Sequence, residues 1–332
     1  MLIINFSIIS GLDYVYLDEG VIILTLKVIT TFITGLGLFI LGMHQLSTGL
    51  HTTTTQRFKS MVSNYKLNPF IGVLIGALST AVIQSSSGTT IILVGLVDAK
   101  ILNLYQAASI IMGANIGTTI TAQLIALDIS KYLSLVIVIG LFLLFFFKKK
   151  YSSLGTALIG FSLIFIGIEN MQSSLHPLQD IARFQEILVE LGKVPIFGVL
   201  IGFLVTAIIQ SSSTGVALLQ SLAANSLLPI QSAISILIGL NIGTCVTTMI
   251  SSIPLSKSGR RAAIIHLLFN ILGAIIVFPC INYLAKIVIM LSPINLTQQI
   301  AHAHSLFNII STIIFIPFIP LFVKLACRIV KK

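Results

Sequence analysis

The sequence predicts an all-α membrane protein built from two inverted repeats, and two observations carry this prediction. The first is composition. Of 332 residues, 56% are hydrophobic and 8% are charged, and the mean hydropathy is +1.08. A chain this apolar has the composition of a multi-pass membrane protein. The second is that polar strings recur at a constant interval of 126 residues. One structural unit is therefore used twice.

The repeat is defined by two pairs of strings. QSSS at 84–87 returns at 210–213, and GANIGT returns as GLNIGT at the same interval. Between 69–87 and the matching stretch 195–213, fourteen of nineteen positions are identical. Buried polar strings of this kind, repeated in an apolar chain, are typical of a transport site.

About seven apolar runs are long enough for a full crossing of the bilayer, which takes roughly 20 residues. They fall near 21–50, 104–127, 131–147, 154–171, 228–254, 262–290 and 303–325. Two further runs, 69–100 and 195–221, are cut by QSSS into arms of about 14 residues, too short to span alone. Each is predicted to be a re-entrant helical hairpin, whose irregular tip must be covered by protein or water.

Basic residues predict the orientation. With the N-terminus outside and the C-terminus in the cytoplasm, fourteen of the nineteen Lys and Arg residues lie on the inner side, as the positive-inside rule requires. Three crossings then separate the hairpins, so the two repeats are inverted. The predicted organisation is an extracytoplasmic segment 1–20, a first repeat 21–150, a second repeat 151–291, and a last transmembrane helix with a basic cytoplasmic tail at 292–332.

Two function classes are excluded. A net charge of +10 would suggest a nucleic-acid partner in a soluble chain, but here the basic residues lie in short loops beside the lipid bilayer. A serine hydrolase would need a base near a serine. His266 or His304 could serve, but no acidic residue lies at a usable spacing to orient it. We therefore expect no enzyme and no cofactor other than a coupling ion.

The serines of each string begin the second arm of their hairpin. Serine is a favoured N-cap residue, and the first turn of a helix offers unpaired N–H groups and the positive end of the helix dipole. An anion fits there, and the two tips of inverted repeats would face each other. The predicted oxyanion ligands are Gln84, Ser85, Ser86, Ser87, Gln210, Ser211, Ser212 and Ser213. The alternative is that the hydroxyls only cap the half-helices.

The two Asn-Ile-Gly runs fall in the middle of crossing segments, where glycine lowers helix stability. We expect each of these helices to be discontinuous, with carbonyl, amide and hydroxyl oxygens exposed to Na⁺. The predicted sodium ligands are Asn115, Thr118, Thr119, Asn241, Thr244, Thr89 and Thr214. Polar contacts between helices are the alternative. No Arg lies deep in an apolar run, so a bound anion needs co-bound cations for neutralisation.

A further pair of motifs lies near the C-terminus. His266 and Asn270, and again His304 and Asn308, are four residues apart and so share a helix face. They would either line a proton or substrate path or form hydrogen bonds that lock two helices together. The second arrangement is the commoner one.

The doubled QSSS with GANIGTT and GLNIGTC, followed by RRAAIIHLLFN and HAHSLFNII, resembles the sodium/phosphate cotransporter family over about residues 30–325. The resemblance implies a sodium-coupled inorganic phosphate symporter of the cell membrane, with phosphate and sodium held at the hairpins. Many bacterial relatives end in a cytoplasmic PhoU-like domain, whereas this sequence stops at Lys332. Regulation through a PhoU-like domain is therefore expected to be absent or to be supplied by a separate PhoU-like partner.

Two alternatives stay open at this point. One is a Na⁺- or H⁺-coupled transporter of another oxyanion or of a small carboxylate, which would keep the same dipole site. The other is a membrane scaffold or regulator that transports nothing.

Overall fold

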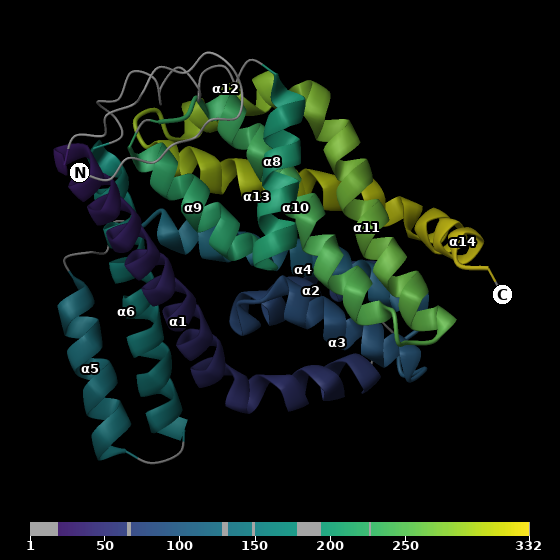
Figure 1. Cartoon of the computed structure of the whole chain (residues 1–332). Helices are drawn as coiled ribbons and strands as arrows, with labels where there is room; N and C mark the ends of the chain where they lie inside the picture. Colours follow the sequence, from purple (N-terminus) through teal and green to yellow (C-terminus); the bar gives the residue numbers. More distant parts are fainter. Residues whose placement is uncertain are drawn as a thin grey trace.

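The computed structural model describes residues 19–64, 68–127, 132–147, 150–177, 194–225 and 227–331 (Figure 1). In these ranges there are helices and no strands. Six helical stretches are long and apolar enough to cross a membrane, and the protein is a multi-pass membrane protein. The predicted N-terminal segment up to residue 18 lies outside the described residues, as do the loops 128–131 and 178–193.

Three helices form one side of the molecule. They are α1 (Glu19–Asn64), α5 (Leu133–Phe146) and α6 (Lys150–Leu175). Along α1 and α6, Gly35 lies against Gly167 and Gly42 against Gly160. A Cβ atom at any of these four positions would overlap the backbone of the other helix. Glycine therefore allows α1 and α6 to pack closely and antiparallel.

The predicted crossing at 131–147 is shorter than expected. The helix there, α5, has 14 residues, which is about 21 Å of helix against a hydrocarbon core of about 30 Å. The apolar run between Lys131 and Lys148 has 16 residues, just below the range of about 17–25 residues that is usual for a crossing. The described residues thus hold six helices of crossing length, and α5 is a shorter apolar helix.

Each QSSS string divides a pair of short helices, as predicted. The pairs are α2 (Pro69–Ile83) with α3 (Ser86–Asp98), and α8 (Pro195–Ile209) with α9 (Ser212–Ala224). In both copies the first arm has 15 residues and the second has 13. The sequence repeat is therefore also a repeat of helix lengths.

A longer helix packs against the first arm of each pair. These helices are α4 (Leu104–Ile125) beside α2 and α10 (Ile230–Ser252) beside α8. Gly113 of α4 lies against Val73, and Gly117 lies against Ala77 one turn further along both helices. The two helices are therefore parallel, and the intervening segment with α3 must return the chain to the side from which α2 started.

The predicted break in α4 and α10 is wrong, because both helices are continuous through Asn115 and Asn241. Asn115 Nδ2 donates to Ile111 O over 3.0 Å, and Asn241 Nδ2 donates to Leu237 O over 2.9 Å. These amides thus bond to carbonyls of their own helix. The neighbouring glycines serve the close contact with α2 and α8 and do not unwind the chain.

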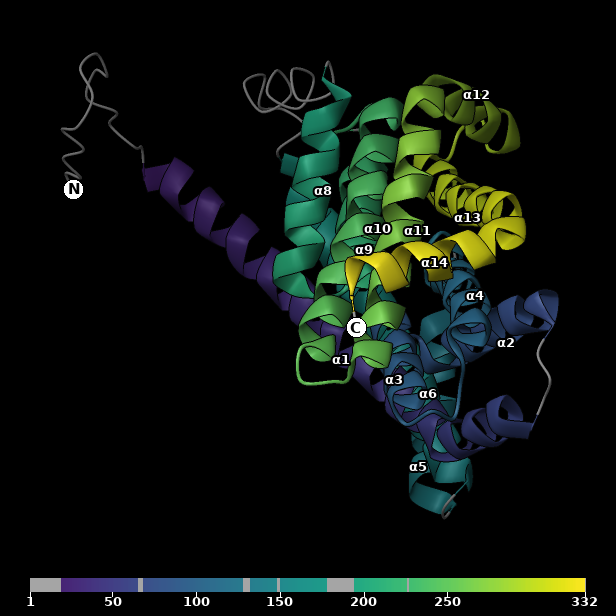
Figure 2. The same ribbon diagram turned by 90° about the vertical axis from the view of Figure 1, so that its right-hand side faces the viewer.

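The last four helices form a second, shorter repeat. They are α11 (Lys257–Val277), α12 (Ile281–Leu291), α13 (Leu296–Phe315) and α14 (Ile319–Ile329). A 3₁₀ turn with a proline joins each pair, at Phe278–Cys280 and at Ile316–Phe318. Proline has no N–H and its ring clashes with the preceding turn, which bends a helix. In Figure 2, α14 bends back from α13 and runs across α11, and α12 likewise packs against α13.

Contacts at two ends of the molecule relate the repeats to each other. Asp98, at the end of α3, accepts a hydrogen bond from Ser256 N over 2.7 Å, just before α11. Elsewhere, Gln220 Nε2 of α9 donates to Ala122 O of α4 and to Thr297 O of α13, over 3.0 and 3.1 Å. The start of α4 therefore lies near the end of α10, and the end of α4 lies near the end of α9.

Apolar side chains both fill the core and cover the outer surface. An apolar cluster between α9, α10, α12 and α13 includes Phe307, which is 1% exposed. On the outside, Phe145 is 76% exposed and Ile208 is 78% exposed. Large apolar side chains on the outside are favourable where lipid covers them.

Candidate functional site

Both hairpin tips have the same unusual backbone. Gln84 and Gln210 end α2 and α8 in the left-handed conformation, each with φ of 58°. Their N–H groups bond to Thr80 O and Thr206 O over 2.8 and 2.7 Å. A residue with a side chain pays on the order of 1–2 kcal/mol there, and glycine is the usual choice. Both copies have glutamine, so the strain points to a use for the long amide side chain.

The serines after each glutamine cap the second arm, as predicted. Ser85 Oγ accepts from Gly88 N over 3.0 Å, and Ser211 Oγ accepts from Thr214 N over 3.2 Å. Both residues are extended, with φ of −149° and −143°. The first N–H groups of α3 and α9 have no intrahelical acceptor, so each tip offers donors and the positive end of a helix dipole.

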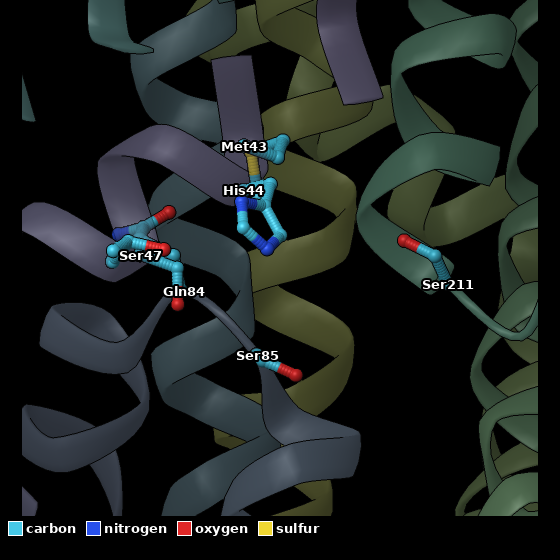
Figure 3. A pocket seen from close by; sticks show the side chains of 7 residues that line it. Met43, His44, Ser47, Gln84, Ser85 and Ser211 are labelled. Atoms are coloured by element: carbon cyan, nitrogen blue, oxygen red, sulfur yellow. The ribbon is translucent and has the colours of Figure 1, made fainter. Parts of the chain in front are cut away.

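A cavity of about 540 Å³ brings residues of the two tips together. Gln84 and Ser85 line it from the first repeat, and Ser211 lines it from the second. In Figure 3, Ser211 lies across the cavity from Gln84 and Ser85, with His44 of α1 between them. The two sides of the site are therefore contributed by equivalent positions of the two repeats.

Among the described residues, the lining carries donors but no Asp, Glu, Lys or Arg. His44 is its one titratable side chain, and the others are amide, hydroxyl or thioether groups. An anion here would be held by dipoles, hydroxyls and amides. Such a site suits an oxyanion, whose oxygens accept several hydrogen bonds at once.

The other predicted oxyanion ligands do not line this cavity. Ser86, Ser212 and Ser213 are buried, with 6%, 5% and 8% of their surface exposed. Ser87 is half-buried and Gln210 is exposed. The structure thus brings together three of the eight predicted residues, while the other five lie beside them in the chain.

Sequence reasoning missed the contribution of α1 to the cavity. Met43, His44, Ser47 and Thr48 all line it. Ser47 Oγ also donates to Ile83 O over 3.1 Å and so ties the first tip to α1. A signal was present, because His44, Ser47 and Thr48 are spaced i, i+3 and i+4 and form one polar face in an otherwise apolar run.

The predicted sodium ligands are buried but do not line the cavity. The set is Asn115, Thr118, Thr119, Asn241, Thr244, Thr89 and Thr214, each with 6% of its surface or less exposed. Their N–H and O–H groups bond mostly to their own helix: Thr118 Oγ1 donates to Ala114 O over 3.0 Å, for example. The carbonyl and hydroxyl oxygens keep free lone pairs. In the described residues no group of three or more His, Cys, Asp or Glu could hold a metal ion.

Comparison with known proteins gives a family. The model of the Na⁺/Pi-cotransporter family matches this chain twice, over residues 38–174 and 171–301. The same model thus matches two successive stretches, as an internal repeat requires. No solved structure matches the chain.

Individual relatives agree with this family. YqeW of Bacillus subtilis is 30% identical over 266 residues, which cover 80% of this chain and 86% of YqeW. YjbB of Escherichia coli, named provisionally for inorganic phosphate export, is 28% identical over 76% of this chain and 47% of its own length. Sodium-dependent phosphate transport protein 2A of Rattus norvegicus is 34% identical over 40% of this chain and 23% of its own length. This chain spans about half of YjbB. On the double match and these relatives, the chain belongs to the Na⁺/Pi-cotransporter family.

Proposed function

We propose that this protein is a sodium-coupled symporter of inorganic phosphate that works by alternating access. The observation that carries the proposal is the cavity shared by Gln84, Ser85 and Ser211. Helix N-termini from both repeats meet at this cavity, and none of the three side chains carries a formal charge. Such a site suits an oxyanion that must be bound and then released. A site with fixed cations would hold phosphate more tightly and release it more slowly.

Neutral ligands make cation coupling a physical requirement. Phosphate carries one to two negative charges at neutral pH, and an uncompensated charge inside the bilayer costs several kcal/mol. Dipoles and hydroxyls offset part of this cost. Sodium bound to buried amide and hydroxyl oxygens would offset the rest, so that phosphate and Na⁺ cross together. The proposed ligands are the predicted sets, with His44 and Ser47 added to the phosphate site.

The direction of the helices supports an inverted arrangement. The bond from Ser256 N to Asp98 joins the segment after α10 to the end of α3, and the bond from Gln220 to Ala122 joins α9 to the last part of α4. Each long helix thus ends beside the second arm of the other repeat, which supports opposite directions for α4 and α10. The parallel packing of α2 on α4 is what a re-entrant hairpin needs. Inverted hairpins that meet in the membrane give a site that either face can reach. We assign the N-terminus to the outside and the C-terminus to the cytoplasm from the basic loops, which takes the shorter apolar helix α5 as a seventh crossing.

A second cavity supports the idea of two entrances. It has about 550 Å³ and lies between the ends of α4, α6 and α9 and the start of α13. Glu169 and Asn295 line it, and none of the tip serines does. We propose that this second cavity is the entrance for phosphate from the other face of the membrane. In the conformation described here it is separated from the tip serines.

The relatives favour phosphate as the cargo and leave the direction open. The rat relative is named for sodium-dependent phosphate transport, and the bacterial YjbB is named for phosphate export. A symporter runs in whichever direction the combined gradients favour. Under an inward sodium gradient we therefore propose uptake, and export when the phosphate gradient exceeds it.

The direct test is uptake of radiolabelled phosphate by proteoliposomes that contain the purified protein. An inward Na⁺ gradient is compared with equal gradients of K⁺ and of H⁺. The proposal requires accumulation above equilibrium with Na⁺ alone. Accumulation driven by the H⁺ gradient would instead identify H⁺ as the coupling ion. Competition by sulfate or small carboxylates, with no phosphate uptake, would favour a transporter of another anion.

A control variant separates transport from the scaffold alternative. Ser162 on α6 is 0% exposed, bonds to its own helix and lies in neither cavity. Ser162→Ala should transport normally, while Ser85→Ala with Ser211→Ala should not. Normal uptake by the double variant would contradict the assigned site.

A further inference from the structure

The two His-Asn pairs, which the proposed phosphate site leaves unused, both face α10. His266 Nδ1 lies 3.2 Å from Thr248 Oγ1, and Asn308 Nδ2 donates to Asn241 Oδ1 over 3.4 Å. Asn270 and Asn308 are both 0% exposed. The pairs therefore belong to the core between α10, α11 and α13 and do not touch lipid.

Three polar atoms on one side of α13 are buried and have no hydrogen-bond partner in the described part of the chain. They are Asn308 Oδ1, Ser311 Oγ and His304 Nδ1. These residues are 0%, 2% and 1% exposed. Folded proteins pair almost all such atoms with protein, water or ions. The carboxamide oxygen of Asn308 can only accept, so it lacks a donor or a cation.

Asn241 adds another oxygen to this group. Its Oδ1 accepts from Asn308 over 3.4 Å, which is long for an N–H···O bond. A cation beside Asn308 would therefore displace a weak contact and gain a second carboxamide oxygen. Ser311 lies three residues beyond Asn308, so both side chains are on the same face of α13.

We propose that Asn241, Asn308 and Ser311 hold a sodium ion between α10 and α13. The ligands are two carboxamide oxygens and one hydroxyl, all neutral and hard, which is the chemistry that binds Na⁺. A divalent ion would need carboxylates, and the described residues hold no such group of three or more. The inference rests on the proposed function because sodium is the coupling ion there. It adds α13 to the predicted sodium ligands.

An ion at this place would link the two repeats. Asn241 belongs to α10 of the second repeat, while α13 is bonded to α4 of the first. Gln123 Nε2 of α4 donates to Ser305 Oγ over 2.9 Å, and Thr312 Oγ1 of α13 donates to Met112 O over 3.4 Å. Sodium would therefore hold α10 against a helix that is already attached to α4.

The chain contains a matched control at Asn270. Asn270 Nδ2 donates to His266 O over 3.1 Å, as Asn308 Nδ2 donates to His304 O over 3.0 Å. Both amides also have an unpartnered Oδ1 within the described residues. However, Gly273 stands on α11 where Ser311 stands on α13, 38 residues later, so α11 has no hydroxyl of its own at this position, and Ser311 Oγ lies beside Gly273.

The experiment measures the Tm of the full-length protein in detergent without phosphate, in NaCl and in KCl of equal ionic strength. We expect sodium to raise the Tm of the natural protein and of Asn270→Ala. Asn308→Ala and Ser311→Ala should lose most of this sodium-specific shift. Ser311→Ala removes a hydroxyl that has no protein partner, so it should fold normally in KCl.

Transport then gives a second measurement. For Ser311→Ala and Asn308→Ala we expect the Na⁺ concentration for half-maximal uptake to rise about tenfold, as for the loss of one ligand. The phosphate KM at saturating Na⁺ should be unchanged. Equal losses of Tm in both salts, or an equal loss of the sodium shift in Asn270→Ala, would show a structural role only and overturn the proposal. No sodium shift in the natural protein would also overturn this site, whereas the symport itself is decided by the uptake assay.

Discussion

Thr121 Oγ1 of α4 donates a hydrogen bond to Gln84 Oε1 at the first hairpin tip over 2.8 Å. The equivalent residues of the second repeat, 126 positions later, are Thr247 and Gln210. Thr247 Oγ1 is buried without a partner in the described residues, and Gln210 is exposed. The two tips share a backbone conformation, so the difference lies in the side chains. Within the described residues, this side-chain bond to the long helix is present at the first tip and absent at the second.

We predict that the second tip forms the missing bond in another state of the transport cycle. Thr121→Val leaves Gln84 Oε1 without this donor and should lower stability by about 1 kcal/mol. Thr247→Val should leave the Tm unchanged, because the hydroxyl has no partner in this state. Its phosphate turnover in proteoliposomes should fall about tenfold if the bond forms later in the cycle. Unchanged turnover in Thr247→Val would contradict the prediction.

The charge of the capping residue tests the phosphate site without removing the cap. Asp and Asn cap helices about as well as Ser, so Ser211→Asp and Ser211→Asn should both keep the Tm of the natural protein. Two negative charges about 4 Å apart repel by roughly 4 kcal/mol at an effective dielectric constant of 20. Uptake by Ser211→Asp should therefore fall on the order of a hundredfold or more, while Ser211→Asn stays active. Equal activity of the two variants would place phosphate elsewhere.

The pairs of short helices were predictable because two signals coincide at each QSSS string. QSSS interrupts an apolar run, which limits each arm to less than a crossing, and serine at that point favours the start of a helix. The structure has Ser85 and Ser211 as N-caps, as expected. The left-handed conformation of Gln84 and Gln210 was not predictable, since that conformation usually takes glycine or asparagine.

The helix break at Asn115 and Asn241 was not a safe prediction, because glycine has two uses in membrane helices. It lowers helix stability, and it also permits close packing. Gly113 and Gly117 lie against the backbone of α2, and this contact depends on the fold and not on local sequence.

The polar face of α1 could have been found from the spacing of His44, Ser47 and Thr48. This polar face occurs once in the chain, whereas the serine strings occur twice, so it is the weaker signal.

Two glycines test the role of close helix packing. A Cβ atom at Gly202 of α8 would overlap Ile236 O of α10, whereas one at Gly95 of α3 would meet nothing within 4 Å. Gly202→Ala should therefore destabilise the protein by about 1–3 kcal/mol. Gly95→Ala should be neutral or stabilise it by up to about 1 kcal/mol, since alanine favours helix. Thermal unfolding in detergent measures both. Similar Tm values for the two variants would mean that α8 and α10 can move apart without cost.

Labelling from either side of the membrane tests the inverted orientation. Ile294, between α12 and α13, is 99% exposed, and Lys257 is exposed at the start of α11. The proposed topology puts position 294 outside and position 257 in the cytoplasm. Cysteines are introduced singly after Cys280 and Cys327 are replaced by serine, since these are exposed or half-buried, while Cys245 is buried.

A membrane-impermeant maleimide should then label Ile294→Cys in intact cells and Lys257→Cys only in inverted vesicles. The two positions lie at opposite ends of the helical stretch Lys257–Leu291, which is 35 residues long and apolar enough to cross. Labelling of both from one side would mean that this stretch does not cross, which would contradict the proposed topology. Reversed labelling would keep the inversion but place the basic loops outside, against the positive-inside rule.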